Sequence, residues 1–371
     1  MRRTLLVIGL ILLHAVGGFL LYITVKPLGA DTLVADPDPA ATPQEALARW
    51  AAVEARDDET IDPRCRSWSR LHDEPAETTV VLLHGYTNCP YMFRRLGEDL
   101  HALGWNVIAP RFPYHGYADK LTPEQGRFRA EDIVATTDEA VDIAEGLSDR
   151  VVVGGLSAGG VAAAWAAQNR PEVDHVVGLA PMVNLRPIPD WFAPQVSNAV
   201  RAVPDIQYWW DPGRKEEIPP DYGYPKLSSH AVAELIRLGM VTLEQARAEP
   251  HTAQHVVLTT NANDGAVKPA TVEAMVAAWQ DNGASASVYE WPAEMAGPLG
   301  GSLETEVEAR PSRGDHPVQH PLAVRSNRKR VGISNPMNWN AGLDFRVHLS
   351  PRSWRCSPAG QTAVVAHYST F

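Results

Sequence analysis

The fold is decided by residues 151–169, which read VVVGGLSAGGVAAAWAAQN. The three valines at 151–153 are typical of a strand buried on both faces, and the alanine-rich run at 161–167 is typical of a helix. The pentapeptide Gly155-Leu156-Ser157-Ala158-Gly159 therefore forms a tight strand-to-helix turn, in which glycines at both ends let the two elements pass closely. Such a turn strains the central residue and raises its hydroxyl above the sheet at the positive end of a helix. Because a glycine-rich turn without chemistry would not need serine at its centre, we predict that Ser157 is a nucleophile.

The rest of the chain alternates strands and helices around this turn. Buried apolar runs predict strands, and three- and four-residue spacing predicts helices between them. This order is typical of a mostly parallel sheet with helices on both faces. The expected strands are 80–83, 105–109, 151–153, 175–179, 255–259 and 287–291, and the expected helices are 90–103, 129–147, 158–169 and 269–281.

One interval, about 182–254, breaks the alternation. It is rich in Trp, Tyr and Pro, holds a helical stretch near 229–247, and is too long for a loop in a compact domain. An insertion here would lie over the carboxyl ends of the strands, where α/β sheets bind ligands. We interpret it as a cap that shapes an apolar acyl or aromatic pocket; a surface insertion without a role is the alternative.

Two further motifs fit acyl transfer. The loop His84-Gly85-Tyr86-Thr87 follows the first buried strand and could supply the main-chain N–H of Tyr86 to an oxyanion, with the N–H of Ala158 as the second donor. His84 is in the wrong chain order for a base and is expected to hold the loop. Asp264 follows a strand and precedes a helix, where it could orient a histidine. The chain order Ser, Asp, His favours this role, and an Asx turn or helix cap is the alternative.

These motifs give a resemblance. Residues 64–292 resemble the α/β-hydrolase family, in the branch of serine aminopeptidase-like and monoacylglycerol-lipase-like carboxylesterases, through LLHGYTNCP, NVIAPRFPYHGYADKLT, GGLSAGG and TTNANDGAV. The resemblance implies Ser157 as nucleophile, Asp264 as triad acid, and an oxyanion hole from Tyr86 and Ala158. It implies no metal and no organic cofactor, and it names no substrate.

The base departs from the family pattern. No histidine follows the last expected strand until His316, and only His320, His348 and His367 come after it. Residues 297–371 also carry more basic than acidic residues, unlike the acidic remainder, and lose hydrophobic periodicity. Either a long excursion returns His316 to Asp264, or the tail is an out-of-frame translation that replaces the true histidine loop. The abrupt change of composition favours the second interpretation.

The N-terminus predicts a membrane anchor. Arg2 and Arg3 precede an uncharged run at 5–25, long enough to cross a bilayer with the N-terminus in the cytoplasm and the domain outside. A cleaved signal peptide and a buried core helix are the alternatives. We divide the chain into the anchor 1–26, a tether with a short helix 27–63, the domain 64–296 and the tail 297–371. Cys65 and Cys89 could form a disulfide suited to that compartment, or be unrelated thiols.

The expected activity is hydrolysis of short, medium or monoacylglycerol-like esters through an acyl-enzyme. A net charge of −11 argues against nucleic acid or anionic lipid as the main partner. The alternatives are a membrane-tethered binding protein that has lost its base, and an amidase or peptidase of the same fold. The oligomeric state is left open.

Overall fold

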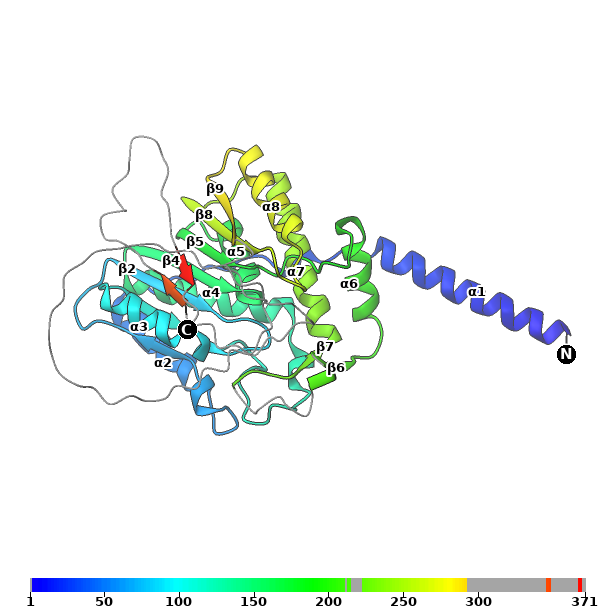
Figure 1. Ribbon diagram of the computed structural model, residues 1–371, viewed down its shortest axis with the longest axis horizontal. Helices are drawn as coiled ribbons and strands as arrows, with labels where there is room; N and C mark the ends of the chain where they lie inside the picture. Colours follow the sequence, from blue (N-terminus) through cyan, green and yellow to red (C-terminus); the bar gives the residue numbers. More distant parts are fainter. Residues whose placement is uncertain (1, 211, 215–221, 292–344, 348–365, 369–371) are drawn as a thin grey trace, which may run out of the picture.

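A seven-stranded sheet forms the centre of the computed structural model, which describes residues 2–210, 212–214 and 222–291 and the backbone of 345–347 and 366–368 (Figure 1). The strand order is β1-β3-β2-β4-β5-β8-β9, and all neighbours are parallel except β1 and β3. The expected mostly parallel sheet is confirmed, and β1 is an additional antiparallel edge strand. The bounds are β1 (Trp68–Arg70), β2 (Thr78–Leu83), β3 (Asn106–Ala109), β4 (Arg150–Leu156), β5 (Val173–Leu179), β8 (His255–Asn261) and β9 (Ala286–Trp291).

The register of the central strands positions the turn. Strands β2, β3 and β4 are buried along almost their whole length, as continuous apolar runs require. Leu83 at the end of β2 pairs with Gly155 in β4, and Leu156 pairs with Leu179 in β5. The carboxyl ends of three strands therefore meet at Ser157.

Helices cover both faces of the sheet, as expected (Figure 1). Helix α3 packs with Trp68, Val80 and Leu82 in one apolar cluster, and the larger cluster on the other face joins α4, α5, α7 and α8. The fully buried Trp165 and Trp279 belong to the larger cluster. The bounds are α3 (Arg94–Ala102), α4 (Ala130–Leu147), α5 (Ala158–Asn169), α7 (Ser229–Ala248) and α8 (Pro269–Asp281).

The segment that follows the apolar helix α1 (Arg2–Val25) differs from our expectation. We expected a tether with a short helix at 27–63; the helix is present as α2 (Pro43–Glu54), but Leu33 and Trp50 are buried in the main core. The carbonyl of Leu33 also accepts a hydrogen bond of 2.7 Å from the indole of Trp165, and α2 packs against α4. Leu33 is an isolated apolar residue in a Pro- and Asp-rich segment and gives no periodic signal, so its packing was not predictable.

The insertion is also narrower than expected. Helix α7, which we placed in the cap, contributes Leu235 and Leu238 to the main core and packs against α5 and α8. Within the insertion, the hairpin of β6 (Gln207–Trp209) and β7 (Lys226–Ser228) contributes Tyr208 and Leu227 to the pocket at Ser157, whereas α6 (Ala193–Arg201) packs against α7 and α1. Strands β10 (Phe345–Val347) and β11 (Ala366–Tyr368) pair with each other; the rest of the tail, with His316, lies outside the described residues.

Candidate active site

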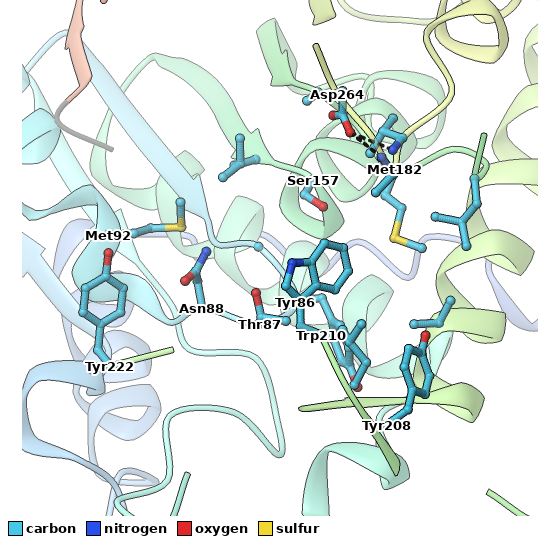
Figure 2. Close-up of a pocket in the computed structure, with 18 residues that line it drawn as sticks. Tyr86, Thr87, Asn88, Met92, Ser157, Met182, Tyr208, Trp210, Tyr222 and Asp264 are labelled. Carbon is cyan, nitrogen blue, oxygen red and sulfur yellow. Dashed lines mark hydrogen bonds between the residues drawn. The ribbon is translucent and has the colours of Figure 1, made fainter. Parts of the chain in front are cut away.

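Ser157 lies at the tip of a strained strand-to-helix turn. Its φ of 54° and ψ of −106° place a non-glycine residue in a region that L side chains rarely adopt. The strain is held by the main chain: the Ser157 N–H donates to the carbonyl of Leu179 at 2.9 Å, and its carbonyl accepts from Met182 and Val161 at 3.0 Å each. The side chain is left to face the pocket shown in Figure 2.

The glycines around Ser157 are required by close approach. A Cβ on Gly155 would overlap the carbonyl of Gly159, and a Cβ on Gly159 would overlap the carbonyl of Leu83. A Cβ on Gly160 would come within 2.9 Å of the Cα of Pro181. In each case the obstacle is backbone, which cannot move aside without disturbing β2, α5 or the turn after β5.

The loop after β2 is fixed by buried hydrogen bonds. The Nε2 of His84 accepts from the N–H of Phe112 at 3.0 Å, so the proton lies on Nδ1, which donates to the carbonyl of Gly85 at 2.8 Å. Burial lowers the pKa of His84 well below its ordinary value, which keeps the ring neutral. The expectation that His84 holds the loop is confirmed.

Tyr86 and Ala158 flank the serine. Neither main-chain N–H is used in a turn or loop hydrogen bond within residues 2–210 and 222–291, so both donors are available. The hydroxyl of Tyr86 accepts a 3.0 Å hydrogen bond from the N–H of Ser228, which ties this loop to the cap. The other donor, Ala158, is the first residue of α5, where the helix dipole favours negative charge.

Asp264 lines the same pocket, in the turn between β8 and α8 (Figure 2). Its Oδ1 accepts from the N–H groups of Ala266 and Val267 at 2.8 and 2.9 Å, which is the Asx-turn role considered from the sequence. Its Oδ2 is buried and has no hydrogen-bond partner among the described residues. Burial raises the pKa of the carboxyl group because the charged form loses its water. An unpartnered oxygen of this kind is suited to a donor such as a histidine ring.

The pocket is mainly apolar. Its volume is about 120 Å³. It is lined by residues of the loop after β2, of the cap and of the turn that holds Asp264. The sequence indicated an aromatic cap but not which side chains reach the site. Those identified here are Asn88, Met92, Met182, Leu185, Tyr208, Trp210, Tyr222, Leu227 and Val232.

Part of the chain is similar to known proteins. Residues 78–220 match the family model described as alpha/beta hydrolase fold. The chain therefore has the α/β-hydrolase fold. A thermostable monoacylglycerol lipase from Bacillus sp. (strain H-257) is 30% identical over 117 residues, or 31% of this chain and 45% of the relative. The match thus spans less than half the length of that lipase.

Solved structures of similar proteins include the metagenome-derived lipolytic enzymes LipS and LipT, with a TM-score of 0.48, 20% identity, and coverage of 62% of this chain and 89% of the other. A monoacylglycerol lipase from Paleococcus ferrophilus gives a TM-score of 0.47, 18% identity, and coverage of 60% and 88%.

A disulfide braces the loop that carries Tyr86. Cys65 and Cys89 are bonded, which resolves the two alternatives left by the sequence. Beside them the guanidinium of Arg111 donates to Asp57 at 2.7 Å, and both side chains are largely buried. The disulfide joins the segment before the sheet to the loop that carries Tyr86, and the ion pair joins the same segment to the loop after β3.

No histidine lines the pocket within residues 2–210 and 222–291. The buried His115 packs edge-on against Tyr86 and His84. Burial lowers its pKa to about 4. The predicted base His316 falls outside the described residues. The structure therefore brings together Ser157, Asp264, Tyr86 and Ala158 but does not test the base.

Proposed function

We propose that this protein is a serine esterase of the α/β-hydrolase family that works through an acyl-enzyme. The observation that carries the proposal is the shared pocket: a strained Ser157 and a buried Asp264 with one unpartnered oxygen line the same cavity. Backbone strain at Ser157 and loss of water around the Asp264 carboxylate are both unfavourable, and an ordinary solvated turn would avoid them.

Each residue has a stated role. Ser157 attacks the ester carbonyl, and the N–H groups of Tyr86 and Ala158 stabilise the oxyanion. A histidine from the segment after Trp291, for which His316 is the candidate, takes the serine proton and passes it to the leaving alcohol. Asp264 accepts from that ring through Oδ2 and stabilises the imidazolium. Water then hydrolyses the acyl-enzyme by the same steps.

The pocket favours an apolar acyl group. Methionine, leucine, valine and aromatic side chains form most of the lining, with Asn88 and Thr87 as polar exceptions near Ser157 (Figure 2). The curated relative is a monoacylglycerol lipase. We therefore propose monoacylglycerols and short- to medium-chain esters as substrates.

The anchor and the disulfide support a location at the cell membrane. Residues Thr4–Val25 form a helix of mean hydropathy 2.4 that is long and apolar enough to span a bilayer, a property that signal sequences share. The Cys65–Cys89 disulfide suits an oxidising compartment. We propose that α1 remains attached and that the catalytic domain lies outside the cytoplasm.

The test is hydrolysis by the purified full chain in detergent. We expect turnover of p-nitrophenyl butyrate and of monoacylglycerols, little turnover of aminoacyl p-nitroanilides, and none of either ester by Ser157→Ala. Turnover of amides in preference to esters would contradict the esterase assignment and favour the amidase alternative.

A second candidate is a binding protein without catalysis, which the lack of a pocket histidine in the described residues favours. It predicts that wild type and Ser157→Ala bind monoacylglycerol equally and that neither hydrolyses it. A rate difference between the two proteins would exclude this candidate.

A further inference from the structure

We propose that the exposed apolar residues Trp191, Phe192, Val203 and Ile206, here called the α6 surface, lie in the interface of the bilayer that α1 crosses. We further propose that lipid-like substrate enters the pocket along this surface, past Tyr208. The entry step rests on the proposed esterase function; the membrane contact rests only on the anchor and the surface.

The level of the bilayer is set by the end of α1. Tyr22 is 43% exposed in the last turns of the helix, and the ammonium of Lys26 lies 5.2 Å from the centre of its ring. Tyrosine and lysine at the end of an apolar span mark the headgroup region. This end of α1 therefore marks the bilayer surface on the side of the hydrolase domain.

Helix α6 lies at that same level (Figure 1). The side-chain amide of Asn198, 1% exposed, donates to the carbonyls of Ile23 and Lys26 at 3.2 and 2.7 Å. The buried amide of Asn198 thus satisfies two main-chain carbonyls at the end of α1. A helix bonded to the last turn of a membrane span must itself reach the headgroup region.

Both ends of α6 carry exposed apolar side chains. Trp191 and Phe192, just before the helix, are 77% and 40% exposed, and Val203 and Ile206, just after it, are 43% and 62% exposed. Trp191 also lines a groove together with Val25 and Lys26. Large apolar groups held in water are costly, whereas the headgroup–acyl boundary accommodates them, tryptophan especially.

The α6 surface is continuous with the pocket. Ile206 is followed directly by β6, whose Tyr208 is 41% exposed and also lines the cavity that holds Ser157. An acyl chain leaving the bilayer at Ile206 would meet the aromatic ring of Tyr208 next.

The orientation is fixed by a buried clamp. Arg237, 3% exposed, donates to the carbonyls of Leu28 and Gly29 and to the hydroxyl of Thr32, and also pairs with two carboxylates, Glu131 at 2.7 Å and Glu234 at 3.0 Å. The residues after α1 are therefore bound to α4 and α7. Because the domain does not swing on a free tether, α1 presents the α6 surface to the bilayer and not to a distant partner.

The contact is tested by fluorescence quenching. The full chain is placed in nanodiscs of phosphatidylcholine, a zwitterionic lipid chosen because the protein is acidic, with bromine on the upper acyl carbons. We expect brominated lipid to quench part of the tryptophan emission, Trp191→Phe to remove most of that quenched part, and the control Trp105→Phe to retain it. Equal quenching in Trp191→Phe and wild type would overturn the membrane contact, as would extraction of the chain by alkaline carbonate.

The entry step is tested by kinetics in the same nanodiscs. We expect Ile206→Ser to lower hydrolysis of bilayer-borne monoacylglycerol by about three- to tenfold while hydrolysis of soluble p-nitrophenyl acetate stays unchanged. The matched control is Leu103→Ser, which makes the same aliphatic-to-polar change at an exposed site after α3. It should change neither rate. An equal fall on both substrates would overturn the entry step. Inactivity of the wild type would overturn the proposed function and the entry step together, while quenching still decides the membrane contact.

Discussion

Asp264→Asn separates a catalytic carboxylate from a structural one. The two hydrogen bonds from Ala266 and Val267 reach Oδ1, and an asparagine oxygen can accept both. Oδ2 becomes an amide NH₂, which points a donor at the place where a histidine ring should donate. A triad histidine would then take the wrong tautomer, and we expect kcat to fall by about 10⁴-fold.

Stability should move the other way. Burial raises the pKa of the Asp264 carboxyl group in the folded protein. Ionisation of this group therefore lowers the free energy of unfolding as pH rises above the pKa of the unfolded state, and the loss is complete above the pKa of the folded state. Asparagine has no charge to desolvate. We expect Asp264→Asn to unfold at a higher urea concentration than wild type at pH 8, with the difference shrinking as pH falls through the carboxyl pKa.

Asp264→Ala is the matched control for the turn, because it leaves two buried N–H groups without an acceptor. We expect it to lose about 2–4 kcal/mol of unfolding free energy. The assays are ester hydrolysis, with protein concentration corrected for the folded fraction, and urea unfolding from pH 4 to 8. An Asp264→Asn variant with wild-type kcat would refute the triad role and leave Asp264 as an Asx-turn residue.

Three further perturbations follow from the geometry. Gly159→Ala should abolish activity and lower the unfolding temperature, because its Cβ meets the Leu83 carbonyl, whereas Gly154→Ala, whose Cβ lies 3.3 Å from a leucine methyl, should retain both in the same assays. Cys89→Ser should cost about 3 kcal/mol in urea unfolding, given a separation of 24 residues, and an unchanged midpoint would mean that the bridge carries no stability. Burial, with Glu172 nearby, raises the pKa of Glu145 to about 7, so wild-type stability should fall as pH rises from 4.5 through 7. In thermal melts, Glu145→Gln should flatten this fall. A variant whose unfolding temperature changes with pH in parallel with that of wild type would contradict the shift.

Much of the fold was predictable because its signals are local. The turn at Ser157 was found because strand, glycines and helix occupy one stretch, and the bounds of α5 and α8 agree with the expected helices. Asp264 was found from its position after β8. In each case the residues that decide the structure are neighbours in sequence.

The remainder depends on contacts between distant residues. Leu33 is isolated among polar residues, yet its carbonyl completes the hydrogen bond of Trp165, 132 positions later. Helix α7 looked like part of the cap because it follows the aromatic segment, and only its packing on α5 assigns it to the core. Trp210 and Tyr222 were visible as aromatic residues, but their approach to Ser157 depends on the β6–β7 hairpin.

The central claim is that the hydroxyl of residue 157 is an activated nucleophile. The most direct measurement is peptide mass spectrometry after treatment of the folded full chain with a fluorophosphonate. We predict one phosphonyl adduct, located on the peptide that carries Ser157, and none in Ser157→Ala despite an unchanged circular dichroism spectrum. A folded wild-type chain that stays unlabelled, or one that is labelled at another serine, would contradict the account.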